Sequence, residues 1–219
     1  TQLVFCPQDI LLGVGCARGA AADEVIDLIM AELQTANINA ASIAAVVTAD
    51  IKADEPAIHA LASMLAVPLR VFDRDVLAAE TDRLENPSQV VFDEIGLHGV
   101  AEAAALAAAG PEGKLIHPKS KSGNATMALA QAGAFPLPAL PGRKPGRVML
   151  IGIGPGKAEW RTPEASQMIL GADELVGYDL YIDLLGAAAA HIPRRDFKLG
   201  EEEARCRYAL ESAATGKDV

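Results

Sequence analysis

The chain has few cysteines, few aromatic residues and no excess of basic residues. Its three cysteines, Cys6, Cys16 and Cys206, lie far apart, which fits neither a disulfide framework nor a metal-binding cluster. The four histidines are scattered and show no ligand spacing. Aromatic residues make up 4% of the chain, and 29 acidic residues face 19 basic ones. We therefore expect no metal and no nucleic-acid partner, since nucleic acids require basic and stacking side chains.

Long hydrophobic runs are also missing. No segment approaches the length of about 18 apolar residues that suggests a membrane helix. The first residues, TQLVFCPQD, lack the basic and apolar segments of a signal peptide. We expect a cytoplasmic protein without a membrane partner. Because 51% of the residues are hydrophobic, the chain can bury a sizeable core, and a small molecule is the expected ligand.

In the front part, short β-branched runs alternate with amphipathic helical segments. The predicted strands are 9–15, 43–50, 67–73, 114–119 and 124–133. The predicted helices are 20–36, a helix with Asp54 as its N-cap, and 98–109. This alternation predicts an α/β fold of three layers, with helices on both faces of a mainly parallel sheet.

A change of composition divides the chain. The stretch FPLPALPGRKPGR is rich in proline and glycine, which disfavour helices and central strands. We therefore expect a front domain of residues 1–134, a linker of residues 135–146 and a second segment of residues 147–219. That segment contains a predicted strand at 147–154, a helix at 162–172, a strand at 174–179 and a charged helix at 200–214.

A first glycine cluster, GVGCARG, stands where a strand passes into a helix. Glycines there let a backbone approach a ligand, and Arg18 is suited to clamp an anion. The spacing of Gly13, Gly15 and Gly19 differs by one residue from the dinucleotide fingerprint, which argues against that cofactor. A tight turn packed on the sheet is the alternative. Cys16 fits either a nucleophile with a lowered pKa or a small buried side chain.

A second cluster, TADIKADE, follows the next predicted strand. Because open α/β sheets bind ligands at the carboxyl ends of their strands, Asp50 and Lys52 are expected beside the first cluster. Asp54 is interpreted as a helix cap rather than a ligand-binding residue.

These motifs carry a family resemblance. GVGCARG, TADIKADE, LAVPLRVF and GVAEAAALAAAG occur in that order, and residues 9–133 resemble the small domain found at the C-terminus of CbiG-type proteins and alone as CobE. The resemblance implies a role in cobalamin biosynthesis and a tetrapyrrole (precorrin) substrate. It leaves two alternatives for this domain, a hydrolase that opens a cobalt-precorrin lactone with release of acetaldehyde, or a non-enzymatic precorrin carrier. The candidate substrate-binding residues are Gly13, Gly15, Cys16, Arg18, Asp50 and Lys52.

A third motif, GIGPG at 152–156, follows the predicted strand of the second segment. It is not a phosphate-binding P-loop, because Lys157 is followed by Ala158 and Pro155 removes an amide donor. It predicts either a structural turn or a rigid floor without side chains, on which a flat ligand can lie.

GIGPG, Thr162-Pro163 and GADELVGYDLYIDLL together resemble the start of a tetrapyrrole methyltransferase, closest to precorrin-3B C(17)-methyltransferases. That family uses S-adenosylmethionine to methylate the macrocycle, with ring contraction at this step. It usually has Asp where this chain has Lys157. The candidate cofactor-binding residues, which would also face the substrate, are Gly152, Gly154, Pro155 and Gly156. No catalytic residue is assigned, because methyl transfer depends mainly on orientation and exclusion of water.

The resemblance also predicts an incomplete methyltransferase. An SSGDPG-like segment and the second half of that family's fold do not follow residue 219. We expect a truncated chain, a proteolysed chain or a fragment of a longer bifunctional protein, which does not methylate by itself. Val148, Leu150 and Ile153 should then be partly uncovered, which predicts formation of a homo-oligomer or disorder behind the linker.

Overall fold

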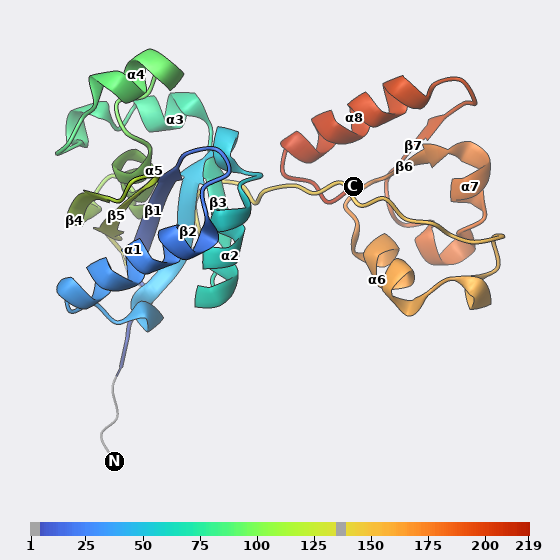
Figure 1. Ribbon diagram of the computed structural model, residues 1–219. Coiled ribbons are helices and arrows are strands. Elements are labelled where there is room, and N and C mark those ends of the chain that lie inside the picture. The colour runs from blue at the N-terminus through green and yellow to red at the C-terminus, as the bar shows by residue number, and fades with distance from the viewer. Residues whose placement is uncertain (1–4, 135–138) are drawn as a thin grey trace. The chain divides into compact units, whose positions relative to one another are not determined.

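A computed structural model describes residues 5–134 and 139–219 (Figure 1). The chain forms two compact units, residues 1–144 (unit 1) and residues 145–219 (unit 2). Four residues of the predicted linker, 135–138, lie outside the described residues.

Unit 1 contains a five-stranded sheet in the order β3-β2-β1-β5-β4. Its strands are β1 (Ile10–Cys16), β2 (Ile43–Ala49), β3 (Leu69–Phe72), β4 (Lys114–Lys121) and β5 (Ala125–Gln131). The first three are parallel, and the β4–β5 hairpin adds antiparallel to β1. The five predicted strands are therefore confirmed, and the sheet is parallel where helices connect its strands.

Helices cover both faces of this sheet, so the three-layer fold is confirmed. They are α1 (Ala22–Thr35), α2 (Pro56–Leu65), α3 (Arg74–Ala78), α4 (Gln89–Ile95) and α5 (Val100–Ala109). In Figure 1, α1 and α2 lie in front of the sheet and α5 behind it. Alternate residues of β1 divide between the two cores: Leu12 and Val14 pack with α1 and α2, while Leu11 packs with α5.

Gly13 and Gly15 belong to the α5 face of β1. A Cβ atom at Gly13 would lie 1.9 Å from the carbonyl oxygen of Ala101, and one at Gly15 would lie 2.8 Å from Oγ1 of Thr126. Both glycines are buried. They lie inside β1 and not in the turn that was the alternative. The backbone of α5 packs against Gly13, and the absence of a side chain at Gly15 leaves room for Thr126 and Val100.

A buried carboxylate joins α5 to the loop at residues 85–86 and to β4. The side chain of Glu102 accepts hydrogen bonds from the amides of Glu85, Asn86 and Lys119 and from Nδ2 of Asn86, at 2.8–3.0 Å. Burial raises the pKa of Glu102, but these donors outweigh it and hold the pKa below its usual range. Glu102 is therefore a structural anion.

Two predicted features are wrong. The N-cap residue of α2 is Glu55, not Asp54, and its side chain does not cap the helix. The carboxylate of Asp54 accepts from Arg18, and that of Glu55 accepts from the amide of Gly19. Residues 150–154 form no strand. Only Arg147 makes a bridge, parallel to Asp218, and Leu150 is 96% exposed. Within the described chain, no strand forms backbone hydrogen bonds with residues 150–154. A strand needs such a neighbour to satisfy its backbone amides and carbonyls.

Unit 2 has a small parallel sheet of β6 (Leu175–Tyr178) and β7 (Arg194–Phe197), with α6 (Pro163–Gly171), α7 (Asp179–Asp183) and α8 (Glu202–Ala214). The helices predicted at 162–172 and 200–214 and the strand at 174–179 are confirmed, and Oγ1 of Thr162 caps α6 by accepting from the amide of Ala165. Val148 and Leu150 are exposed, as expected. No helix of the described residues is long and apolar enough to cross a membrane.

Replacement of Gly13 tests the close packing of α5. Gly13→Ala should lower the free energy of unfolding by about 3 kcal/mol or more, because backbone atoms of α5 cannot move aside cheaply. Urea unfolding followed by circular dichroism measures it. Gly123→Ala is the control, since its Cβ would meet only Oε1 of Glu24 at 3.5 Å. Equal stability of Gly13→Ala and wild type would contradict this packing.

The carboxylate of Glu102 should make the stability of unit 1 depend on pH. Because its pKa is lowered in the folded state, its contribution is present above the unfolded pKa of about 4.3 and is lost as pH falls through the folded value. Glu102→Gln should cost about 2 kcal/mol at pH 7 and less at acid pH. An equal loss at both pH values in urea titrations would refute this role.

Candidate functional site

The loops after β1, β2 and β3 meet at one edge of unit 1. We call residues 16–19, 50–55 and 73 the carboxyl edge; it includes the 3₁₀ helix Asp50–Lys52. The edge unites the two sequence clusters, because parallel neighbouring strands end on the same side of a sheet.

Glu55 holds this edge together. Its side chain is 1% exposed, and its Oε1 lies 3.0 Å from Nε of Arg18 and 3.5 Å from Nζ of Lys52. Its Oε2 accepts a hydrogen bond of 3.1 Å from the amide of Gly19. One buried carboxylate therefore ties the loop after β1 to the loop after β2 and has two cationic partners.

Each nitrogen of the Arg18 guanidinium has a partner within the protein, although the side chain is 61% exposed. Besides Glu55, it donates from Nη1 to Oδ1 of Asp54 at 2.6 Å and from Nη2 to the carbonyl of Ile51 at 2.9 Å. The hydrogen bond from Arg18 holds the pKa of Asp54 below its usual range. Arg18 thus joins the loops of the edge in this structure, and its role in binding an anion stays a prediction.

Cys16 ends β1 and is half-buried beside these charges. Burial raises the pKa of its thiol, and the negative charge of Glu55 adds to that rise; Lys52 and Arg18 oppose it without reversing it. A nucleophilic thiolate needs the opposite shift. The structure therefore favours the alternative of a small, protonated side chain.

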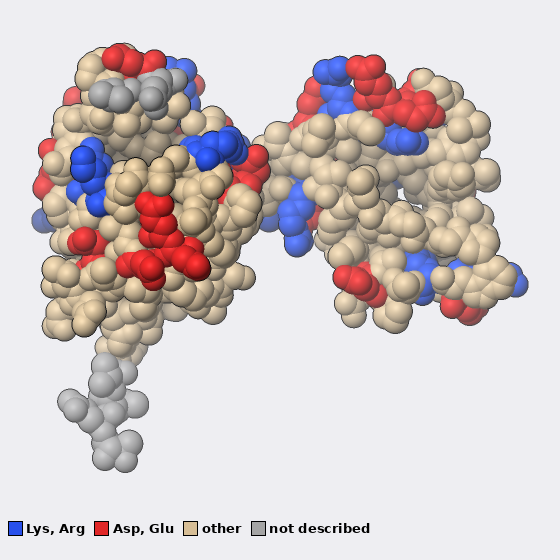
Figure 2. Space-filling model, in the orientation of Figure 1, with Lys and Arg blue, Asp and Glu red and all other residues tan. Residues whose placement is uncertain are grey.

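Asp73 and Arg143, which sequence reasoning missed, also contribute charges at this edge. Nη2 of Arg143 lies 3.2 Å from Oδ1 of Asp73 and 3.7 Å from Oδ2 of Asp50, whose Oδ1 accepts from the amide of Ile51. No signal in the sequence joins Arg143 to strand ends about 70 and 90 residues earlier. In Figure 2, a group of acidic side chains lies near the middle of the visible face of unit 1, with basic side chains apart from it. Acidic residues outnumber basic ones in residues 1–144, 17 to 10.

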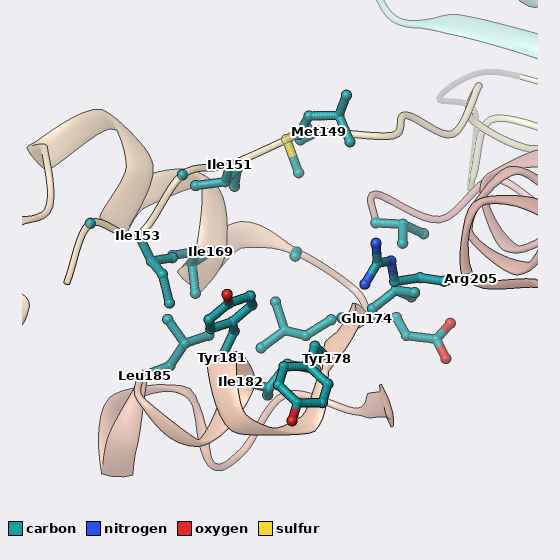
Figure 3. A pocket seen from close by; sticks show the side chains of 18 residues that line it. Met149, Ile151, Ile153, Ile169, Glu174, Tyr178, Tyr181, Ile182, Leu185 and Arg205 are labelled. Atoms are coloured by element: carbon teal, nitrogen blue, oxygen red, sulfur yellow. The ribbon is translucent and has the colours of Figure 1, made fainter. Parts of the chain in front are cut away.

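Unit 2 contains a cavity of about 580 Å³ (Figure 3). Residues 149–154 form one wall, and β6, α6 and α7 supply others. The lining is mainly aliphatic, and Figure 3 shows Tyr178 and Tyr181 among these side chains, with Glu174 and Arg205 at one end. The rings of the two tyrosines meet edge to face, with centroids 5.4 Å apart.

The GIGPG loop contributes only partly to this cavity. Gly152 and Gly154 line it, and a Cβ at Gly152 would meet no atom within 4 Å. Pro155 and Gly156 do not line it. Gly156 has φ +104° and lies against Leu184, so it serves the turn itself.

Glu174 is used structurally. Its carboxylate accepts from Oη of Tyr208 at 2.6 Å, Oγ of Ser212 at 2.7 Å and Nζ of Lys217 at 2.9 Å. Burial raises its pKa, but these donors outweigh it and the pKa is lowered. A carboxylate so held fixes α8 beside the cavity and is unsuited to donate a proton. Among the described residues, no group of three or more acidic, histidine or cysteine side chains could hold a metal.

Comparison with known proteins identifies unit 1. The family described as the cobalamin synthesis G C-terminus matches residues 10–130. The chain belongs to this family. A role in cobalamin biosynthesis, expected from the resemblance of four motifs in residues 9–133, is thereby supported.

Solved and curated relatives agree with this assignment. Protein CobE of Sinorhizobium sp is 46% identical over 121 residues, which cover 55% of this chain and 79% of the relative. The crystal structure of a CobE from the cobalamin pathway superposes with a TM-score of 0.54 at 35% identity, covering 57% of this chain and 91% of that one.

Two enzymes from Priestia megaterium are more partial relatives. A cobalt-precorrin-5A hydrolase is 30% identical over 128 residues, 58% of this chain but 33% of the hydrolase. A cobalt-factor III methyltransferase is 31% identical over 74 residues, 34% of this chain and 14% of the enzyme. The chain thus spans a third or less of both enzymes.

Removal of the charge on Glu55 tests whether this buried carboxylate stabilises the carboxyl edge. Glu55→Gln should lower the free energy of unfolding by about 2 to 4 kcal/mol, because Lys52 and Arg18 lose their shared buried partner. Asp54→Asn, at a side chain that is 77% exposed, should change it by less than about 1 kcal/mol. Urea titrations measure the free energy of unfolding of both variants. Equal losses would contradict the claim that the buried carboxylate of Glu55 stabilises the edge more than the exposed Asp54 does.

Proposed function

We propose that this chain acts on tetrapyrrole intermediates of cobalamin biosynthesis. Unit 1 binds an anionic precorrin at its carboxyl edge. Unit 2 takes part in the methylation of precorrin-3B at C-17, with ring contraction, from S-adenosylmethionine. The cavity beside the GIGPG loop is the observation that carries the second role, and the match to a cobalt-factor III methyltransferase supports it.

The residues of the cavity fit a donor of this kind. Its volume of about 580 Å³ falls in the usual range for small-molecule sites. The open space at Gly152 leaves room for a flat group, which Tyr178 and Tyr181 would bind by stacking. S-adenosylmethionine would supply an electrophilic methyl group, so the residues of the chain need only bind, orient and exclude water. Ile151 and Ile153 give this wall apolar side chains.

The single tryptophan of the chain offers a direct test. Trp160 is 64% exposed, and its carbonyl oxygen lies 3.5 Å from the Cβ position of Gly154. Titration with S-adenosylhomocysteine should change its fluorescence. Gly152→Val should weaken binding at least about tenfold, because the new side chain fills open space without straining the fold. Gly171→Ala, whose Cβ meets no atom within 4 Å and which does not line the cavity, should bind like wild type.

No change in Trp160 fluorescence and no heat of binding by calorimetry with wild type would contradict a donor site in unit 2. Equal affinity of Gly152→Val and wild type would place the ligand elsewhere.

A second candidate function is hydrolysis of a cobalt-precorrin lactone by unit 1. The likeness to the cobalt-precorrin-5A hydrolase favours it, whereas the raised pKa of Cys16 argues against a thiolate mechanism. A precorrin carrier without turnover is the non-enzymatic alternative to this hydrolysis.

Replacement of Cys16 separates these alternatives. Cys16→Ser should bind cobalt-precorrin-5A like wild type and release acetaldehyde at an unchanged rate, because the thiol stays protonated. A coupled assay for acetaldehyde measures turnover, and absorbance measures binding. Loss of release with intact binding would make Cys16 a nucleophile. Binding without release by wild type would favour the carrier.

A further inference from the structure

The segment around Arg143 forms an additional edge of the sheet in unit 1. The amide of Val71 donates to the carbonyl of Arg143 at 2.9 Å, and the amide of Arg143 donates to the carbonyl of Val71 at 3.1 Å. This antiparallel bridge adds to β3, the edge strand of the sheet. It satisfies backbone groups that an edge strand otherwise exposes.

Gly142 allows the chain to approach β3 closely at this bridge. Its φ is +80°, and a Cβ atom there would lie 2.9 Å from the ring of Phe72 and 3.0 Å from the carbonyl oxygen of Val71. A glycine is needed for both reasons. The position of Arg143 is therefore set by backbone hydrogen bonds and by the close approach of Gly142.

The side chain of Arg143 bridges the ends of two strands. Its Nε and Nη2 donate to Oδ1 of Asp73 at 3.3 and 3.2 Å, and its Nη2 lies 3.7 Å from Oδ2 of Asp50. Asp50 follows β2 and Asp73 follows β3. The guanidinium thus places one positive charge between two carboxylates of the carboxyl edge.

We propose that Arg143 is a specificity-determining residue of the tetrapyrrole site in unit 1; this inference rests on the proposed function. Its charge offsets Asp50 and Asp73, which allows an edge rich in carboxylates to accept an anionic ring. The charges that decide this balance are Arg18, Lys52 and Arg143 against Asp50, Asp54, Glu55 and Asp73. Within this set of described residues, two cations and four carboxylates would remain without Arg143.

Arg143 lies outside the residues that match the family, 10–130. This charge is therefore supplied by the segment behind the family domain. It makes the ligand preference of unit 1 depend on a residue beyond that domain.

The experiment measures binding of cobyrinic acid, a corrinoid with several carboxylates, by absorbance titration of the whole chain. At about 20 mM salt, Arg143→Ala should weaken binding about three- to tenfold, and the loss should shrink at about 300 mM salt, where screening is stronger. Arg143→Lys should retain most of the affinity. Asp73→Asn combined with Arg143→Ala should restore part of it.

Arg147→Ala is the matched control. It removes the same charge four residues later, where Arg147 pairs with Asp218 in unit 2, and it should leave the affinity within about twofold of wild type.

The outcomes separate the two proposals. If wild type does not bind cobyrinic acid, the proposed function of unit 1 fails. If wild type binds and Arg143→Ala binds equally well at low salt, the proposed function stands and the role of Arg143 is overturned. If the double variant is as weak as Arg143→Ala, Arg143 acts through the fold of its segment and the charge argument is overturned.

Discussion

The carboxyl edge of unit 1 depends on one buried carboxylate. Glu55 binds the guanidinium of Arg18, the ammonium of Lys52 and the amide of Gly19, so two loops that follow parallel strands share a single acceptor. A buried carboxylate without such partners would be costly. Because the loops are joined in this way, the groups beside them are held in a fixed arrangement: Cys16 at the end of β1 and Asp50 after β2.

This arrangement limits the chemistry of the edge. The cations are already paired, and the thiol of Cys16 has a raised pKa. The raised pKa disfavours attack by this thiol, so the role proposed for the edge is to bind and orient a ligand. Unit 2 likewise holds a carboxylate with several partners beside its cavity. The lining of the cavity is mainly aliphatic, and the carboxylate of Glu174 accepts from three donors. In the proposed function both units act by binding and orientation, and the reactive methyl group comes from the donor.

Sequence reasoning predicted most of unit 1 because its elements carry strong patterns. The β-branched strand at 43–49 and the helix with Val25, Ile29 and Leu33 on one face are clear in the residues alone. It also placed both clusters on one edge, since the direction of parallel strands follows from alternation with helices. The short helices α3 and α4 were missed, because segments of 5 and 7 residues have too little periodicity.

The remaining errors concern interactions between distant residues. Asp54 has the residue type of a cap, but its ion pair with Arg18 depends on the fold and leaves α2 without a side-chain cap. Residues 147–154 have the composition of a strand, yet strand formation depends on a neighbour that composition does not specify. The bridge from Arg143 to β3 spans about 70 residues and likewise has no local signal.

The central claim is that unit 1 binds a tetrapyrrole at its carboxyl edge. Hydrogen–deuterium exchange, read by mass spectrometry with and without cobyrinic acid, tests it most directly. The account predicts slower exchange of amides in residues 16–22 and 50–55, with little change in α8. Unchanged exchange at both loops in the presence of bound cobyrinic acid would contradict it.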